Sequence, residues 1–152
     1  MVFKTEKQLE NFLLNKCKNA VSKTEKKVHR VINNCLKQFY SEFSPEEYIR
    51  TGQLLHSLVR SGVKATGGGF EAEVYFDVSL LGYQKGVVPT QHGTGFATWD
   101  GGTVLGVAME SGVPHGGYAG GTAIWTVSNQ ILGDILELLE RELIAQGIPI
   151  VK

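Results

Sequence analysis

LENFLLNKCKNAVSKTEKKVHRVINNCLKQFYSEF, residues 9–43, decides the fold of this chain. Apolar positions recur along it at alternating spacings of three and four residues, the period of one face of an α-helix. The stripe consists of Leu14, Cys17, Val21, Thr24, Val28, Val31 and Cys35, with Thr24 as its polar member. The spacing predicts one long amphipathic helix in the segment 1–43.

The far end of this helix is broader and more aromatic than its start. Leu36, Phe39, Tyr40 and Phe43 follow the stripe, and we expect them to meet the core. A helix near 35 residues is long for a small domain, and an apolar stripe that projects beyond its own domain needs a partner. Two partners stay open: a helix of a second copy, or the C-terminal helix of the same chain.

The polar face of the helix is basic. Its cations are Lys16, Lys18, Lys23, Lys26, Lys27 and Arg30. Residues 1–51 hold ten Lys/Arg against six Asp/Glu, although the whole chain is balanced at 15 against 15. Such a face is either solvated or turned towards an acidic protein or a nucleic acid.

Composition describes an ordinary globular protein of 152 residues, with 42% hydrophobic and 20% charged residues. We predict a single domain, 1–152. Cys17 and Cys35 are five helical turns apart and about 27 Å from each other on one helix, so they cannot pair there. Two unpaired, buried thiols and a start without a signal peptide or membrane span predict a protein made in a cytoplasm.

Glycine separates the helical start from the rest, since none of the 19 glycines precedes Gly52. Segment 44–60 is expected to form short helices, because Ser44, Pro45 and Glu47 mark a helix start. Gly52 divides the two pieces, and Thr51 is expected to cap the second one.

Segment 61–127 is expected to hold strands and Gly-rich loops. Apolar and polar residues alternate strictly over 70–78, which predicts a strand, with the glycines 67–69 as the turn of a hairpin. Residues 103–110 and 122–127 are candidate further strands. Part of the stretch 80–121 must pair or become ordered on binding, because forty residues are too many for one structureless loop.

The last element predicted is a helix over 128–147, with Ser128 as its N-cap and Gly147 as its end. Gly133 inside it is expected to be tolerated for close packing. The core stripe is expected to be Ile131, Leu132, Ile135, Leu138, Leu139 and Leu143. The fold class is α+β: a long N-terminal amphipathic helix and a C-terminal helix packed on a small antiparallel sheet with long Gly-rich loops.

The composition of residues 112–125, GVPHGGYAGGTAIW, is compatible with three roles: a phosphate-binding loop, the mouth of an active site, or a surface loop used for assembly. The spacing fits no phosphate-binding motif, and the residues after the glycines look like a strand and not like a helix start. We interpret the glycines as mobility before docking. The candidate interaction loop comprises Pro114, His115, Gly116, Gly117, Tyr118, Gly120 and Gly121.

Chemistry-bearing motifs are scarce. His29, His56, His92 and His115 form no metal-binding spacing, so no metal, cofactor or catalytic residue is predicted. One enzymatic alternative stays open, a small cytoplasmic hydrolase or ligand-binding enzyme that uses His92 and His115 with nearby carboxylates such as Asp100 or Glu110.

Residues 48–58, YIRTGQLLHSL, carry a resemblance to a known family. With its Thr-Gly, leucine and serine, the segment resembles the head-to-tail joining proteins of long-tailed phages, the neck and tail-completion family. The order of a helix, the motif, strands, a Gly-rich region and a final helix is similar to that family along nearly the whole chain. The family-motif residues are Arg50, Thr51, Gly52, Leu54 and Ser57.

The resemblance implies a structural, non-enzymatic subunit of a ring at the head-tail junction of a virion, assembled in the host cytoplasm. Implied partners are like subunits, head-completion or connector proteins, and tail-tube or tail-terminator proteins. DNA would pass through the channel without sequence-specific binding, and no membrane is involved. A purely structural interpretation also stays open, in which the hydroxyls of Thr51 and Ser57 cap or turn a short helix and Leu54 and Leu58 belong to the core. A nucleic-acid-binding accessory protein, acting through the basic first helix, stays as a further alternative.

Overall fold

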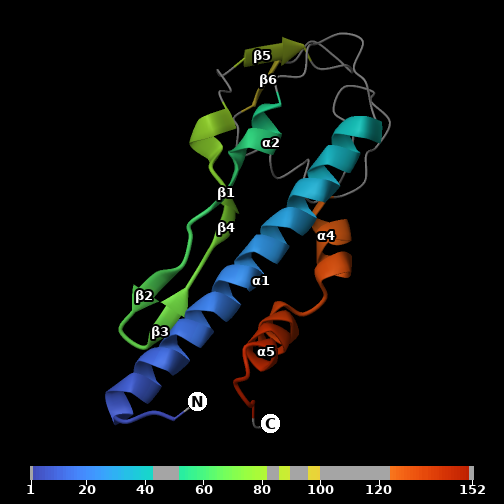
Figure 1. Cartoon of the computed structure of the whole chain (residues 1–152). Helices are drawn as coiled ribbons and strands as arrows, with labels where there is room; N and C mark the ends of the chain where they lie inside the picture. Colours follow the sequence, from blue (N-terminus) through green and yellow to red (C-terminus); the bar gives the residue numbers. More distant parts are fainter. Residues whose placement is uncertain (1, 43–51, 82–85, 90–95, 100–123, 151–152) are drawn as a thin grey trace. The chain divides into compact units, whose positions relative to one another are not determined.

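The computed structural model describes residues 2–42, 52–81, 86–89, 96–99 and 124–150 (Figure 1). The elements are α1 (Glu6–Glu42), α2 (Gln53–Ser57), β1 (Leu58–Arg60), β2 (Lys64–Thr66), β3 (Gly69–Glu71), β4 (Val74–Phe76), η1 (Val78–Leu81), β5 (Gly86–Pro89), β6 (Phe96–Trp99), α4 (Ile124–Leu132) and α5 (Ile135–Ala145). A long N-terminal helix, C-terminal helices and small antiparallel sheets confirm the predicted α+β class.

Contacts divide the chain into two compact units. Unit 1 comprises Met1–Arg30, Arg60–Val74 and Leu132–Lys152, and unit 2 comprises Val31–Val59 and Tyr75–Ile131. Helix α1 contributes its first part to unit 1 and its second part to unit 2.

Helix α1 starts at a capping arrangement that the periodicity did not reveal. The Thr5 hydroxyl accepts a hydrogen bond from the Gln8 amide at 3.3 Å, and the Gln8 side-chain oxygen accepts one from the Lys4 amide at 2.9 Å. This exchange resembles a capping box, in which two side chains satisfy amides that the first helical turn leaves free. The helix therefore begins at Glu6, inside the segment 1–43 where the periodicity predicted it.

Each unit buries a small core. In unit 1 the buried residues are Ala20, Thr24, Glu25, Val28, Leu132 and Leu138. In unit 2 they are Ile32, Cys35, Leu36, Ser57, Leu58 and Ser128.

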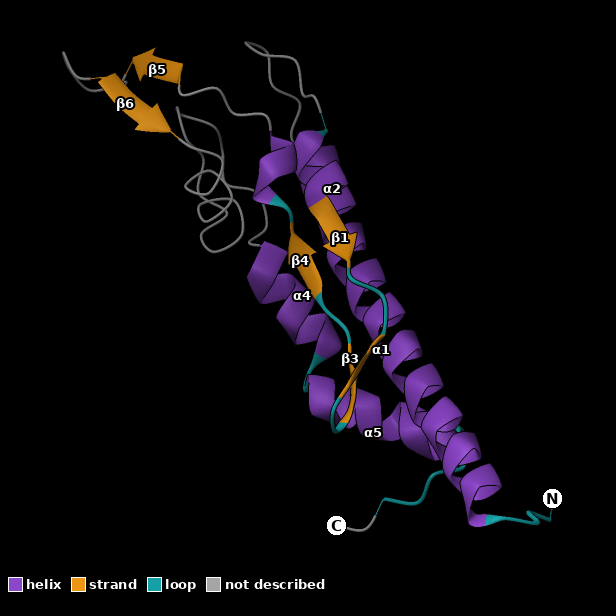
Figure 2. Cartoon of the chain, turned by 90° about the vertical axis from the view of Figure 1, so that its left-hand side faces the viewer, coloured by secondary structure: helices purple, strands orange, loops and turns teal. Residues whose placement is uncertain are grey.

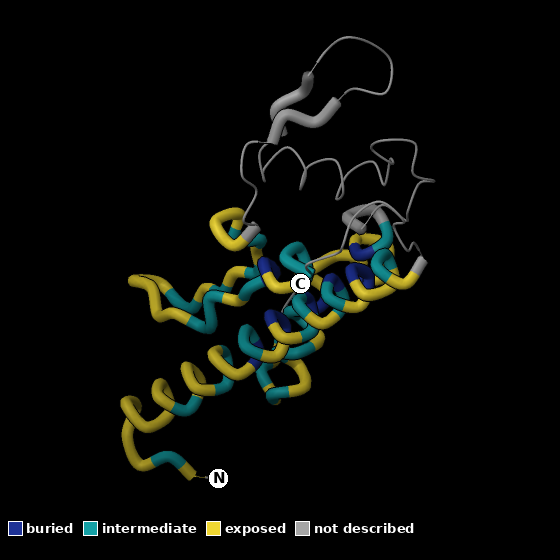
Figure 3. Tube along the Cα trace, turned by 90° about the horizontal axis from the view of Figure 1, so that it is seen from above, coloured by how far each residue is buried: buried dark blue, intermediate teal, exposed yellow. Residues whose placement is uncertain are grey.

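On α1 burial thus begins at Ala20. The predicted stripe is buried at Thr24, Val28 and Cys35 and half-buried at Cys17, Val21 and Val31. Its first member, Leu14, and the nearby Leu9 and Leu13 are 42%, 41% and 41% exposed, and we call these three the open end of the stripe. Figure 3 shows the start of α1 largely exposed.

The predicted glycine hairpin is confirmed. Strands β2 and β3 pair antiparallel, with Lys64 opposite Glu71 and Thr66 opposite Gly69, and Gly67 and Gly68 form the turn. The single strand predicted over 70–78 is wrong, because β3 pairs with β2 whereas β4 pairs with β1 (Figure 2). The change of partner follows Gly62, whose φ of 70° turns the chain between β1 and β2. The alternation survives the break, since Glu71, Glu73 and Tyr75 are exposed and their apolar neighbours are half-buried.

Within the stretch 80–121, β5 and β6 pair antiparallel from Gly86 opposite Trp99 to Pro89 opposite Phe96. The expectation that part of this stretch pairs is therefore confirmed. The predicted strand 103–110 and the helix start at Ser44 lie outside the described residues.

The C-terminal region departs from its prediction. Residues 124–127 belong to α4 and not to a strand, and Ser128 is a fully buried residue inside α4 and not an N-cap. β-Branched and aromatic residues are common in strands because they fit a half-buried pleated surface. This preference depends on context, so the sequence pattern of residues 122–127 did not decide their secondary structure. One helix over 128–147 is also wrong, because α4 ends at Leu132 and α5 begins at Ile135.

Gly133 causes this break. Its φ is 61°, a left-handed conformation that only glycine adopts without strain, and a Cβ built there would meet nothing within 4 Å. The expected reason for this glycine, close packing, is therefore wrong. Asp134 then caps α5, with its carboxylate accepting a hydrogen bond from the Leu136 amide at 2.7 Å.

The break also changes which residues are buried. Leu132 and Leu138 are buried as predicted, whereas Ile131 and Ile135 are 62% and 48% exposed. The predicted stripe assumed one continuous helix, and the turn at Gly133 interrupts the angular sequence of its positions. At the far end Gly147 ends the helix as predicted. Its amide donates to the Ile144 carbonyl at 2.8 Å, and the Ile148 amide donates to the Leu143 carbonyl at 3.0 Å, the two bonds of a Schellman motif.

Candidate functional site

The family-motif residues that the structure describes are Gly52, Leu54 and Ser57, all in unit 2; Arg50 and Thr51 lie outside the described residues. Gly52, and not the expected Thr51, occupies the N-cap of α2, and no side chain caps the helix. The φ of Gly52 is 71°, and a Cβ there would lie 3.5 Å from the His56 ring. The backbone at this turn therefore requires glycine.

Ser57 joins α2 to η1. Its side chain is fully buried, and its hydroxyl donates to the Leu54 carbonyl at 2.9 Å. Its carbonyl accepts a hydrogen bond from the Asp77 amide at 2.8 Å. The Asp77 carboxylate in turn accepts bonds from the Ser79 amide and hydroxyl. These contacts stabilise the local fold, and they agree with the structural interpretation of Ser57 as a hydroxyl that turns a short helix.

The other predicted site residues cannot be placed. The candidate interaction loop, Pro114 to Gly121, and the histidines His92 and His115 lie outside the described residues. His56 is exposed on α2, and His29 is half-buried on α1. Among the described residues, no three His, Cys, Asp or Glu side chains are placed to hold a metal ion.

A buried carboxylate in unit 1 was not predicted. The side chain of Glu25 is 3% exposed, and its Oε1 accepts a hydrogen bond from the Gly62 amide at 2.8 Å. Its Oε2 lies 3.7 Å from the Arg60 guanidinium. Glu25 thereby ties α1 to the turn between β1 and β2. The sequence signal was weak, because a single acid beside the apolar stripe resembles any solvated glutamate.

Replacing Glu25 with alanine should lower the free energy of unfolding by about 1–3 kcal/mol, because the Gly62 amide loses its acceptor in a part-buried place. Glu25→Gln keeps an oxygen for that amide and should cost less. Urea denaturation followed by circular dichroism measures both losses, with Glu71→Ala on the exposed face of β3 as the control. Equal losses for Glu25→Ala and Glu71→Ala would contradict this role.

The two cysteines of the chain both lie on α1. Both are free thiols, with Cys35 buried and Cys17 half-buried. Burial raises the pKa of the Cys35 thiol, which keeps it protonated and poorly nucleophilic at neutral pH.

The most distinctive surface of unit 1 is a row of cations on α1, which we call the basic stripe: Lys16, Lys23, Lys26, Lys27 and Arg30. At 100° per residue these positions fall within about 100° of the helix circumference, and they extend over about 21 Å. Lys16 and Lys27 are half-buried, and the other three are exposed. Lys18 lies outside this row, on another side of the helix.

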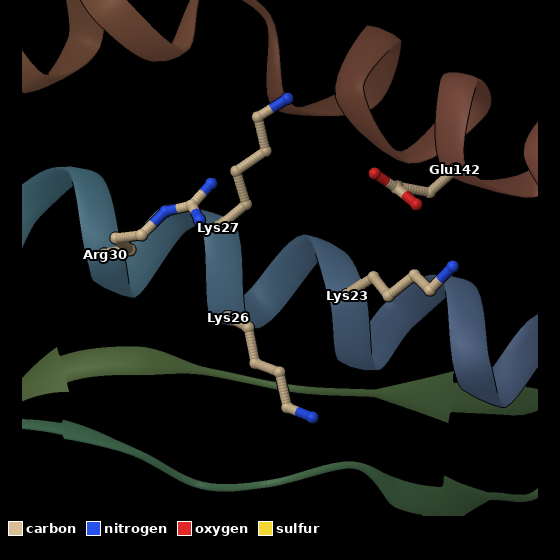
Figure 4. Close-up of a pocket in the computed structure, with 5 residues that line it drawn as sticks. All are labelled: Lys23, Lys26, Lys27, Arg30 and Glu142. Carbon is tan, nitrogen blue, oxygen red and sulfur yellow. The ribbon is translucent and has the colours of Figure 1, made fainter.

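Four members of the basic stripe, Lys23, Lys26, Lys27 and Arg30, line a hollow of about 370 Å³ together with Glu142 of α5. Figure 4 shows Lys26 and Lys27 leaving α1 on opposite sides, with Glu142 reaching over from α5 on the Lys27 side. Within the described part of the chain, none of these four cations forms an ion pair.

Such a row is electrostatically unfavourable by itself. Lys23 and Lys27 are four residues apart, as are Lys26 and Arg30, and each like-charged pair at this spacing costs a helix about 0.2–0.5 kcal/mol. Glu142 is the single carboxylate among the five residues that line the hollow, against four cations. The hollow therefore favours an anion.

Comparison with family models, with curated proteins and with solved structures finds no match to this chain. None of the described helices is long and apolar enough to cross a membrane.

Proposed function

We propose that this chain is a structural subunit of the head-tail junction of a long-tailed phage, of the neck or tail-completion type, which joins head and tail as a ring. The observation that carries the proposal is the open end of the apolar stripe on α1. Leu9, Leu13 and Leu14 continue the line of the buried residues, yet each is about two-fifths exposed. The resemblance of residues 48–58 to the joining proteins supports the same function.

The open stripe needs a partner, because contiguous apolar groups on a helix are stabilised when another surface covers them. A second exposed apolar pair lies on α5 of the same unit, where Leu136 and Ile144 are 68% and 59% exposed. A subunit that exposes two different apolar surfaces can form head-to-tail contacts. Such contacts close into a ring when the rotation between subunits allows it. The partners are then like subunits, a head-completion or connector protein and a tail-tube or tail-terminator protein.

The test combines genetics with a surface variant. In the phage whose genome carries this gene, deleting the gene should leave filled heads and finished tails that remain separate in negative-stain electron micrographs. Wild-type protein from a plasmid should restore virions. Leu9→Gln combined with Leu13→Gln should fail to restore them, although its circular dichroism spectrum stays that of the wild type.

Leu9→Met combined with Leu13→Met is the matched control, because it keeps both positions apolar at similar volume. This variant should restore virions. Intact virions after deletion of the gene would overturn the proposed function, and full activity of the glutamine variant would overturn the role of the stripe.

A further inference from the structure

We propose that the basic stripe of α1 is a binding site for the phosphate backbone of nucleic acid, independent of base sequence. The inference goes beyond the proposed function, since it requires neither a ring nor a partner protein. It depends on the row of Lys16, Lys23, Lys26, Lys27 and Arg30 and on the hollow that the last four line.

The dimensions fit a nucleic-acid strand. The basic stripe is about 21 Å long at 1.5 Å per residue. One strand of B-form DNA presents a phosphate about every 3.4 Å along the axis, so about six phosphates fall within this length. The row is therefore long enough to meet several phosphates, and its five cations, spread over about 100° of the helix circumference, limit the contacts to five at most. Lys26 and Lys27 diverge from the axis (Figure 4), which widens the row across more than one line of phosphates.

The composition of the row favours phosphate over an acidic protein. Protein interfaces are depleted in lysine and enriched in aromatic residues at their centres, whereas nucleic-acid interfaces are strongly basic. Four of the five cations in the stripe are lysines. Among the described residues, the aromatic ring placed against the row is that of Phe12 at its end, with the Lys16 ammonium 5.3 Å from the ring centroid.

Glu142 provides a second test of the site, because its negative charge should weaken the binding of an anion that the cations strengthen. Its carboxylate lies at the same hollow and repels a phosphate, so it weakens whatever anion binds there. Removing that charge must strengthen binding if the anion enters this hollow. A site elsewhere on the molecule would not respond to Glu142 in this way.

The experiment uses the full chain and a fluorescein-labelled DNA duplex of about 20 base pairs, followed by fluorescence anisotropy over a range of KCl concentrations. A plot of the logarithm of the binding constant against that of the salt concentration should have a slope of about −4, as expected for four or five phosphate contacts. Lys23→Glu combined with Lys27→Glu should reduce affinity at least about 30-fold at 50 mM KCl and bring the slope towards −2. Glu142→Gln should raise affinity about threefold or more.

The matched control is Lys18→Glu combined with Lys64→Glu, which changes the net charge equally at two exposed lysines outside the basic stripe. It should lose less than about fivefold in affinity. An equal loss in the control pair, a salt slope near zero or no response to Glu142→Gln would overturn the proposal. Displacement of the duplex by poly-L-glutamate at a lower charge concentration than by unlabelled DNA would also overturn it, because the surface would then prefer an acidic protein. Virion assembly tests the proposed function, and DNA affinity tests the basic stripe. Normal virion assembly with the Lys23→Glu/Lys27→Glu variant would leave the DNA result unchanged, so the two proposals fail separately.

Discussion

Replacing Leu138 with alanine should lower the free energy of unfolding by about 2–5 kcal/mol, the range for removing a fully buried leucine. Leu138 is 1% exposed on α5 in unit 1. Alanine would remove its buried methyl groups and leave a cavity, because the close-packed neighbours relax only partly. With a typical urea dependence of about 2 kcal/mol per molar, the midpoint of denaturation should fall by about 1–2.5 M.

Leu136→Ala is the matched control, because it makes the same chemical change two residues away at a side chain that is 68% exposed. Its midpoint should stay within about 0.3 M of the wild type. Circular dichroism at 222 nm follows both variants. Similar shifts for Leu138→Ala and Leu136→Ala would contradict the burial of α5 through Leu138.

The second large effect is expected at Leu36, which is fully buried in unit 2. Leu36→Ala should also cost about 2–5 kcal/mol. The urea transition followed by circular dichroism at 222 nm should move to lower urea by about 1–2.5 M.

Leu14→Ala is the control on the same helix, since Leu14 is 42% exposed at the open end of the stripe. In the isolated subunit it should cost less than about 1 kcal/mol. A loss at Leu14 as large as that at Leu36 would show that the stripe is covered along its whole length. That result would also remove the observation on which the proposed assembly role depends.

The candidate surfaces were visible in the sequence to different degrees. The basic stripe follows from the helical period alone, because Lys23, Lys26, Lys27 and Arg30 must fall within about 100° of the circumference once the helix is continuous. That Glu142 lines the same hollow was not predictable, since α5 is more than one hundred residues further along the chain. The burial of Glu25 and Ser57 was equally hidden, because each depends on a backbone amide of another segment, Gly62 and Asp77.

Periodicity and glycine chemistry were sufficient for the long first helix, the hairpin turn at Gly67 and Gly68, and the end of α5 at Gly147. Each of these is a local property, in which neighbouring residues share one face or one residue adopts a conformation that others avoid. Only the tertiary structure decided that β4 pairs with β1, that residues 124–127 are helical, and that burial on α1 begins at Ala20 and leaves Leu9, Leu13 and Leu14 exposed. Those features depend on which distant segment supplies the partner and where that segment ends, and no local pattern carries this information.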